Sequence, residues 1–256
     1  MKTQIFRISL LTFIPIGVLL AQVNTESMRK EDAGEGFENT LGFEFGFEKS
    51  DQEVMEIAGE YRIDYFSSGG IHSFLVLNYE NGYEKESSEK NIIVNKGFGH
   101  LRITKNISSD LYIELFTQFG FNDFLLMKDR KLYGSGLRYK VFSNDKLNAY
   151  IGVGGMKEKE QYRLETENFK SLFRSTNYFT WNITLSENAT LNSTVYYQLD
   201  ASKPKDHRIL YDGDFKFELN EKFTFTLTLN YRYDNDPHGT LGETYIQVSN
   251  GIEFSF

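Results

Sequence analysis

Cysteine is absent from this chain of 256 residues, and proline is scarce, with three. The absence of cysteine excludes a thiolate nucleophile, a cysteine-type zinc site and a lipid anchor on an N-terminal cysteine. The scarcity of proline permits long, uninterrupted β-ladders, because proline removes a backbone donor. A basic stripe is also lacking, and the net charge of −8 argues against nucleic acid as a partner.

Long apolar runs are lacking except at the N-terminus. Lys2 and Arg7 precede the apolar run Ile8–Leu20, and the small residue Ala21 follows. This order predicts a signal peptide over residues 1–21. The alternative is a retained membrane anchor, although the run is shorter than the roughly 20 residues that a spanning helix needs.

Residues 22–36 are rich in Glu, Lys and Gly and are expected to form a flexible periplasmic segment. From residue 37 onward the chain alternates apolar with polar side chains. In residues 37–48, for example, Leu41 and phenylalanines share one face, whereas glutamates, a threonine and glycines share the other. That apolar face, and an aromatic content of 16%, are typical of a lipid-facing wall.

Alternation of this kind recurs to the end of the chain without an intervening helix. It predicts an all-β domain over residues 37–256, a transmembrane antiparallel up-and-down β-barrel of about 12 strands. The expected strands are residues 37–48, 53–66, 71–83, 91–105, 111–122, 130–142, 147–157, 170–183, 189–199, 207–219, 223–234 and 243–256.

Short and longer connections alternate between these strands, as in outer-membrane barrels, where short turns and both termini are periplasmic. The short connections are residues 67–70, 106–110, 143–146, 186–188 and 220–222. The longer ones are residues 84–90, 158–169, 200–206 and 234–242, while the first, at 49–51, is short.

A soluble, ligand-carrying barrel is the competing architecture, because alternation does not say which face points inward. Eight strands leave an interior that side chains or one small ligand can fill, whereas a dozen would enclose a wide apolar cavity. The polar face also suits a hydrated lumen. We therefore expect the apolar face to point outward into lipid.

The polar face carries many charged side chains of both signs. They either pair across the wall and stiffen it, or their arginines form a constriction that biases ion passage. The residues are Glu60, Arg62, Asp64, His72, His100, Arg102, Glu114, Gln118, Arg130, Arg138, Arg174, Arg208, Asp212, Asp214, Lys216, Glu218, Arg232 and Asp234.

Three successive motifs on this face resemble a known family. They are His-x-Arg at 100–102, Glu-x-Phe-x-Gln at 114–118 and Arg-x-Leu-x-Gly-x-Gly at 130–136, followed by Arg138. Their order and spacing resemble the salt-induced outer membrane protein family, also called domain of unknown function 481. Residues 174–175, 196–198 and 231–234 with Pro237 resemble its second half. The resemblance covers nearly the whole mature chain and implies an outer-membrane location, with no established activity.

The motif residues allow two structural expectations. Glu114 is expected to form a network with Arg102 and with Arg130 or Arg138, because arginine binds carboxylates bidentately. Gly134 and Gly136 leave room for Phe116 or Tyr112 to lie across the wall.

An enzyme of the outer membrane, such as a lipid-modifying one, is a further alternative. It needs a serine, a histidine and a carboxylate at the rim or on the lipid face. Of the histidines, the register places only His207 toward lipid, and His238 lies in a loop. A nucleophile elbow is lacking, so no catalytic residue is expected. Asp234, Asp236 and His238 in one loop make a poor closed site, so no metal or cofactor is expected either.

The last expected strand places Ile252, Phe254 and Phe256 on one face. A terminal aromatic resembles the signature that the barrel-assembly machinery recognises, so Phe254 and Phe256 are candidate assembly signals. The alternative is simply an apolar last strand.

The sequence thus predicts an outer-membrane barrel that is not an enzyme. Its expected role is a narrow passive pore or a structural, stress-related envelope component. The alternative is binding or adhesion through loops at residues 157–169 and 234–242. The expected partners are outer-membrane lipid and lipopolysaccharide, the barrel-assembly machinery and periplasmic chaperones, together with small ions or solutes.

Overall fold

A computed structural model describes residues 29, 34–49, 52–86, 89–123, 125–166, 168–237 and 242–256. The expected signal peptide lies outside the described residues, as does His238. In the part of the chain that is described, no helix is long and apolar enough to cross a membrane.

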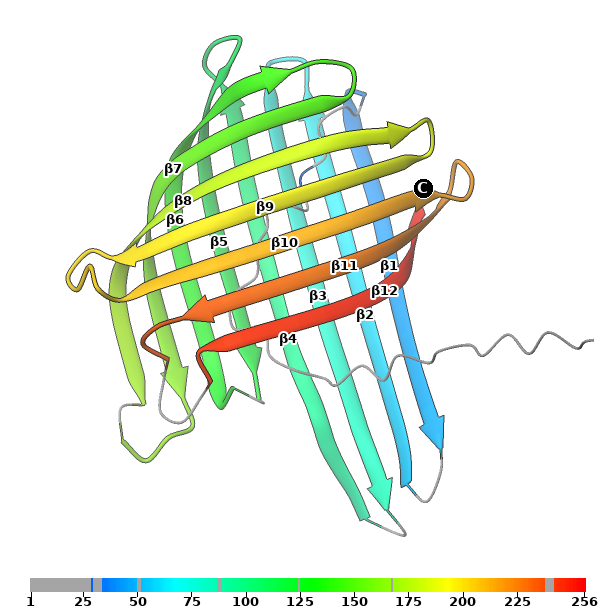
Figure 1. The fold of residues 1–256 in the computed structure, drawn as a ribbon, viewed down its shortest axis with the longest axis vertical. Helices are drawn as coiled ribbons and strands as arrows, with labels where there is room; N and C mark the ends of the chain where they lie inside the picture. Colours follow the sequence, from blue (N-terminus) through cyan, green and yellow to red (C-terminus); the bar gives the residue numbers. More distant parts are fainter. Residues whose placement is uncertain are drawn as a thin grey trace, which may run out of the picture.

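Twelve antiparallel strands form one closed barrel, which confirms the predicted fold (Figure 1). Each strand pairs with its neighbours in the chain, and β1 closes the barrel against β12. The strands are β1 (Gly36–Lys49), β2 (Gln52–Ser67), β3 (Ile71–Glu86), β4 (Glu89–Asn106), β5 (Leu111–Asn122), β6 (Met127–Ser143), β7 (Leu147–Tyr162), β8 (Phe169–Ser186), β9 (Ala189–Asp200), β10 (His207–Glu218), β11 (Phe223–Asp234) and β12 (Thr244–Ser255).

Two expected loops are mostly strand. Residues 84–90 belong largely to the ends of β3 and β4, and residues 158–162 continue β7. The sequence pattern missed these extensions because they carry charged instead of apolar residues. Glu158 and Glu160 nevertheless keep the alternation, since both point inward and meet arginines there. The loop proposed for binding or adhesion at 157–169 therefore shrinks to residues 163–168.

The apolar face points outward, as expected for a membrane barrel and opposite to a soluble one. Large outward side chains are strongly exposed, with Phe37 at 70% and Phe45 at 69%. Inward positions are even-numbered in β1 to β11 and odd-numbered in β12, as the strand registers require, except at the strand ends beyond the bulges at Gly82/Tyr83, Met127/Asp129 and Lys140/Phe142, where the register shifts. The exposed apolar wall needs lipid around it.

Connections of two kinds lie at the two ends of the barrel. The turn rim carries the tight connections 68–70, 107–110, 144–146, 187–188 and 219–222, together with the start of β1 and the end of β12. The loop rim carries the other connections, including residues 163–168, 201–206 and 235–243. β1 to β4 extend beyond their neighbours at the loop rim (Figure 1).

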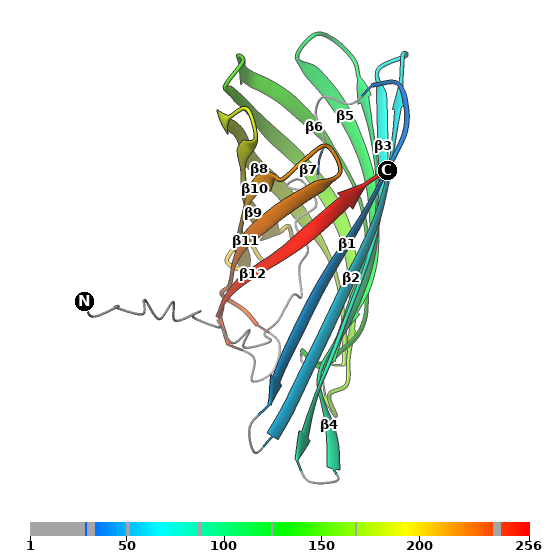
Figure 2. The same ribbon diagram turned by 90° about the vertical axis from the view of Figure 1, so that its right-hand side faces the viewer.

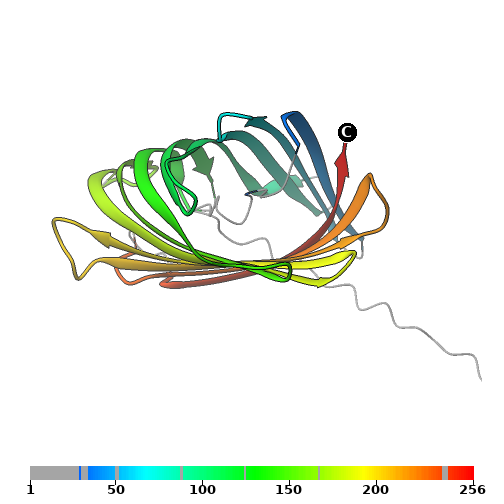
Figure 3. The ribbon, with the colours of Figure 1, turned by 90° about the horizontal axis from the view of Figure 1, so that it is seen from above.

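The barrel is flattened in cross-section, as the view from above shows (Figure 3). Its two walls differ in tilt, since β8 to β12 run obliquely across β1 to β5 (Figures 1 and 2). Flattening brings inward side chains of opposite walls close to one another. Among the described residues, buried ion pairs and hydrogen bonds between side chains therefore concentrate in the interior.

Candidate functional site: the barrel interior

The interior has two halves that differ in solvent exposure. The packed half consists of the inward side chains of β4 to β10, most of which are buried. The acidic half consists of the inward side chains of β11, β12, β1 and β2 and their neighbours, most of which stay partly exposed. Its charged members are Glu44, Glu56, Glu60, Glu80, Lys96, Asp214, Lys216 and Glu253.

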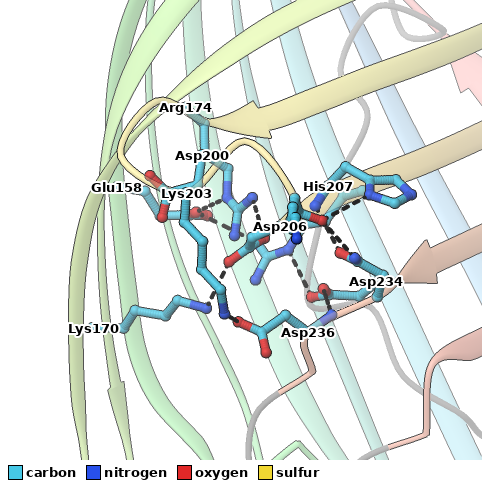
Figure 4. A network of polar contacts seen from close by, with 12 residues as sticks. Glu158, Lys170, Arg174, Asp200, Lys203, Asp206, His207, Asp234 and Asp236 are labelled. Atoms are coloured by element: carbon cyan, nitrogen blue, oxygen red, sulfur yellow. Dashed lines mark hydrogen bonds and ion pairs between the residues drawn. The ribbon is translucent and has the colours of Figure 1, made fainter.

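Glu158 is the centre of an ion-pair network in the packed half near the loop rim (Figure 4). Its carboxylate accepts hydrogen bonds from Arg130 Nε at 2.7 Å and Arg174 Nε at 3.0 Å. Arg208 Nη1 donates to the same carboxylate at 3.3 Å. Glu158 and Arg174 are both completely buried. One carboxylate thus joins three strands, β6, β8 and β10, to its own strand β7.

The same arginines reach further acids at the loop rim (Figure 4). Arg174 Nη1 donates to Asp206 Oδ1 at 2.9 Å, and Arg208 Nε donates to Asp234 Oδ2 at 2.7 Å. Lys170 Nζ lies 3.4 Å from Asp206 Oδ2. Burial of so many charges is tolerated only when each is paired and hydrogen-bonded, which this network achieves.

Glu114 is the centre of a second network, at the middle of the packed half. Its Oε2 accepts a hydrogen bond from Tyr178 Oη at 2.9 Å and lies 3.6 Å from Arg102 Nη1. The Tyr178 contact joins β5 to β8 across the flattened interior. Arg29 also enters this site: it pairs with Glu114 Oε1, and its Nη1 donates to Thr104 Oγ1 at 2.7 Å.

An internal cavity of about 40 Å³ lies beside Glu114. Such a volume holds on the order of one or two water molecules. Polar and aromatic side chains line it, among them His100, Arg102, Glu114, Tyr178, Tyr196 and Gln198. This cavity therefore has room for water beside Glu114.

Aromatic rings fill the remaining space of the packed half by lying over glycines. A Cβ on Gly134 would lie 2.2 Å from the Phe116 ring, and one on Gly152 would lie 2.0 Å from the Tyr178 ring. Phe116 therefore crosses the wall at Gly134, as the motif predicted. Gly136 has a different neighbour, because its Cβ would meet the backbone of β7 at Val153.

Ten of the polar-face residues named from the sequence are buried on the inner wall. They are His100, Arg102, Glu114, Gln118, Arg130, Arg138, Arg174, Arg208, Asp212 and Arg232. The structure joins Arg102 to Glu114, and Arg232 Nη2 to Asp212 Oδ1 at 2.6 Å. Gln118 is buried beside the cavity, and the His100 ring lies between Phe74 and Phe116, with centroid distances of 5.8 and 6.3 Å.

The expected pairing of Glu114 with Arg130 or Arg138 is wrong. Arg130 faces Gly120 near the loop rim, where Glu158 is the closer acid. The Arg138 guanidinium lies over the Tyr150 ring, 3.7 Å from its centroid. The sequence analysis missed Glu158 and Tyr178, although both keep the even-numbered, inward alternation of their strands. It also missed Arg29, for which alternation gives no signal.

The three described histidines, His72, His100 and His207, stand in separate places. His72 Nε2 lies 2.9 Å from Asp64 Oδ1, and Asp64 also pairs with Arg62 Nε at 2.5 Å. His207 faces outward between Tyr197 and Tyr233. Within the described residues, no group of three or more His, Asp or Glu side chains is placed to hold a metal ion.

Phe254 and Phe256 lie at the turn rim with their rings stacked, their centroids 5.7 Å apart. The backbone N–H of Phe256 donates to the Asn39 carbonyl at 3.2 Å. Their role as an assembly signal stays a prediction.

A family model described as "Protein of unknown function, DUF481" matches residues 55–256. The chain belongs to this family. The motif resemblance is thereby confirmed, and the family description assigns no activity to this DUF481 protein. No curated protein has a significantly similar sequence.

Solved structures similar to this DUF481 protein are membrane barrels of very different sequence. The "Translocator domain of autotransporter NalP from Neisseria meningitidis" has a TM-score of 0.50 and 11% identity, over 88% of this chain and 90% of that one. A "NanC porin structure" has a TM-score of 0.48 and 9% identity, over 85% and 97% of the two chains. At this level of identity the likeness shows the fold alone.

Proposed function

We propose that this DUF481 protein is a bacterial outer-membrane barrel that passes small cations slowly along its acidic half, while its packed half braces the wall. The proposal rests on one observation: inside the barrel, positive and negative side chains differ in their exposure to water. The arginines are buried and paired, with Arg102 at 3% and Arg130 at 4% exposure. The charges that water reaches inside the barrel are mostly carboxylates.

The acidic half has an excess of negative charge. Lys96 Nζ pairs with Glu80 at 2.9 Å, and Lys216 Nζ pairs with Glu253 at 2.8 Å. Among the described side chains, no cation forms an ion pair with Glu44 or Glu56. Rows of carboxylates in a narrow lumen favour cations over anions. This arrangement replaces the arginine constriction considered from the sequence with a carboxylate-lined path.

Placement in the outer membrane is supported by the outward apolar wall and by a basic cluster on it. Lys131 and Lys159 lie opposite each other on the outward face of β6 and β7, and Lys157 follows on the same face. Like charges in direct register repel. Phosphates of lipopolysaccharide would relieve this repulsion, which supports a proposed orientation with the loop rim at the cell surface.

The proposal includes no catalytic activity. It is supported by the separation of the histidines and by the pairing of Asp64 with both His72 and Arg62. Loop-mediated adhesion is less well supported, because the loops at 163–168 and 201–206 are short and the second is fixed to the wall through Asp206.

The test is the reversal potential of the refolded protein in a planar bilayer with a KCl gradient. We expect small cation-selective currents, and a shift of the reversal potential toward zero in the triple variant Glu44→Gln, Glu56→Gln, Glu60→Gln. The control is Glu187→Gln, which removes one carboxylate at an exposed turn and should leave selectivity unchanged, and each of the three Gln substitutions is also compared with it singly. Anion selectivity would contradict the proposed carboxylate-lined path, and a silent membrane from folded protein would contradict the proposal and favour a purely structural role.

A further inference from the structure

The closure between β1 and β12 is incomplete. Their register covers only Thr40–Phe43 against Ile252–Ser255, close to the turn rim. From Glu44 to Lys49, β1 continues in register with β2 but not with β12. From Thr244 to Gly251, β12 likewise pairs with β11 alone. From their meeting point near the C-terminus the two strands diverge in both side views (Figures 1 and 2).

We call these two diverging strand edges the seam: residues 44–49 of β1 and 244–251 of β12. Most of the described outward side chains along it are large and apolar, with Phe45 at 69%, Ile246 at 62% and Val248 at 52% exposure, while Thr244 and Asn250 are polar. The seam therefore lies at the depth of the hydrocarbon layer in the proposed placement. An open sheet edge exposed to lipid there leaves backbone N–H and C=O groups without partners, which is strongly unfavourable.

The inward side of the seam belongs to the acidic half. Glu44 is exposed on β1, and Glu56 lies on the inner wall of β2 opposite Gly46, one inward position further along the seam. On β12 the inward residues are the small or neutral Gln247, Ser249 and Gly251. An occupant of the seam thus meets two strand edges that, among the described residues, lie outside the β1–β12 register, mostly apolar side chains on one face and carboxylates on the other.

A lipid can match the apolar outward face and the inward carboxylates of the seam. It cannot pair with the strand edges, because it has no repeating backbone N–H and C=O groups. An extended polypeptide matches the edges and both faces when its side chains alternate between apolar and basic. Strand addition of this kind is a recurrent mode of peptide recognition, in which the main chain supplies affinity and the alternate side chains supply specificity. We propose that the seam binds a β-strand of a partner polypeptide whose outward residues are apolar and whose inward residues are basic.

The first test asks whether the seam is open. Because the chain has no cysteine, a disulfide can form only between the introduced cysteines. The pair Phe43→Cys, Ile252→Cys lies within the paired region and serves as the control. The pair Phe45→Cys, Asn250→Cys would be in register if the ladder continued. In lipid vesicles we expect the control pair to oxidise to a disulfide and the second pair to stay reduced. Equal oxidation of both pairs would mean a sealed wall and would overturn the proposal.

The second test asks what binds. The probe is a synthetic peptide of alternating Val and Lys whose one central Cys carries a thiopyridyl mixed disulfide. The thiolate of Asn250→Cys protein in vesicles attacks the peptide sulfur, forms the protein–peptide disulfide that traps the peptide, and releases thiopyridone. The control protein is Val153→Cys, an equally outward position on β7. We expect at least about tenfold more trapping at residue 250, and a similar loss when Glu replaces Lys in the peptide or Gln replaces Glu44 and Glu56.

Equal trapping at residues 250 and 153, or trapping that ignores the charge of the peptide, would contradict the proposed occupant. So would a disulfide-linked homodimer of the Asn250→Cys protein that excludes the peptide, because a second copy would then fill the seam. The inference uses the membrane placement of the proposed function but not its ion conduction. Cation-selective currents with no peptide trapping would overturn only the seam proposal, and trapping in a silent barrel would overturn only the pore.

Discussion

The packed and acidic halves share one barrel and one alternation, yet their interiors differ. The inward residues of β1, β11 and β12 are mostly Gly, Ser, Thr and Glu, whereas those of β4 to β10 include Phe, Tyr, Leu and Arg. Large inward side chains from both walls meet in the packed half, so that Tyr178 reaches Glu114. The small inward side chains of the acidic half do not reach the opposite wall, so water enters between the walls there. Side-chain size at the inward positions, more than strand number, therefore decides where this barrel is closed.

The largest loss of stability is expected when the central acid of the packed half is removed. Glu158→Ala leaves Arg130, Arg174 and Arg208 buried around a missing carboxylate. Loss of one partner from a buried ion pair costs about 3–5 kcal/mol. We expect the free energy of unfolding in urea, measured in lipid vesicles, to fall by that amount.

The matched control for this prediction is Glu56→Ala in the acidic half, where the side chain is partly exposed. Its effect should stay below about 1 kcal/mol, as for exposed charges. Similar losses for Glu158→Ala and Glu56→Ala would contradict the distinction between the halves.

A smaller effect is expected from adding one methyl group to each half. The Cβ of Gly152→Ala would lie 2.0 Å from the Tyr178 ring, whereas that of Gly46→Ala would lie 3.6 Å from Glu56 Cβ. Overpacking costs about 1–3 kcal/mol, so Gly152→Ala should destabilise the barrel and Gly46→Ala should not. Urea unfolding of both variants checks this, and an equal response would show that the packed half is looser than described.

The smallest expected effect is a pH-dependent loss of stability on removal of the Asp206 carboxylate. Burial raises the pKa of Asp206, but the hydrogen bond from Arg174 and the nearby positive charges outweigh it, so the net pKa is lowered. A carboxyl with a lowered folded-state pKa stabilises the fold above its unfolded pKa of about 3.9, and this contribution is lost as the pH falls through the folded pKa. Asp206→Asn should therefore cost on the order of 1 kcal/mol at pH 7 and progressively less below about pH 4. A cost that does not change with pH would exclude this ion pair as its source.

Alternation in the sequence was sufficient for strand number, for the outward face and for every inward position named. It was insufficient for contacts across the interior, because these depend on how far the barrel flattens. Glu114 shows the difference: its inward direction follows from parity, but Tyr178, its partner on β8, is distant in sequence. The ends of strands were underestimated where charged residues such as Glu158 replace apolar ones. The short β1–β12 ladder left no trace in the alternation, since both strands keep the pattern beyond it.

The central claim is that water reaches one half of the interior and not the other. The direct measurement is the rate at which a cationic, thiol-specific reagent modifies single cysteines, introduced as Ser249→Cys in the acidic half and Thr176→Cys in the packed half. Both positions point inward, and Thr176 is 6% exposed. We predict that residue 249 reacts at least about tenfold faster in lipid vesicles, because thiol modification depends on access. Equal rates would show a uniformly hydrated or uniformly closed lumen and contradict the division.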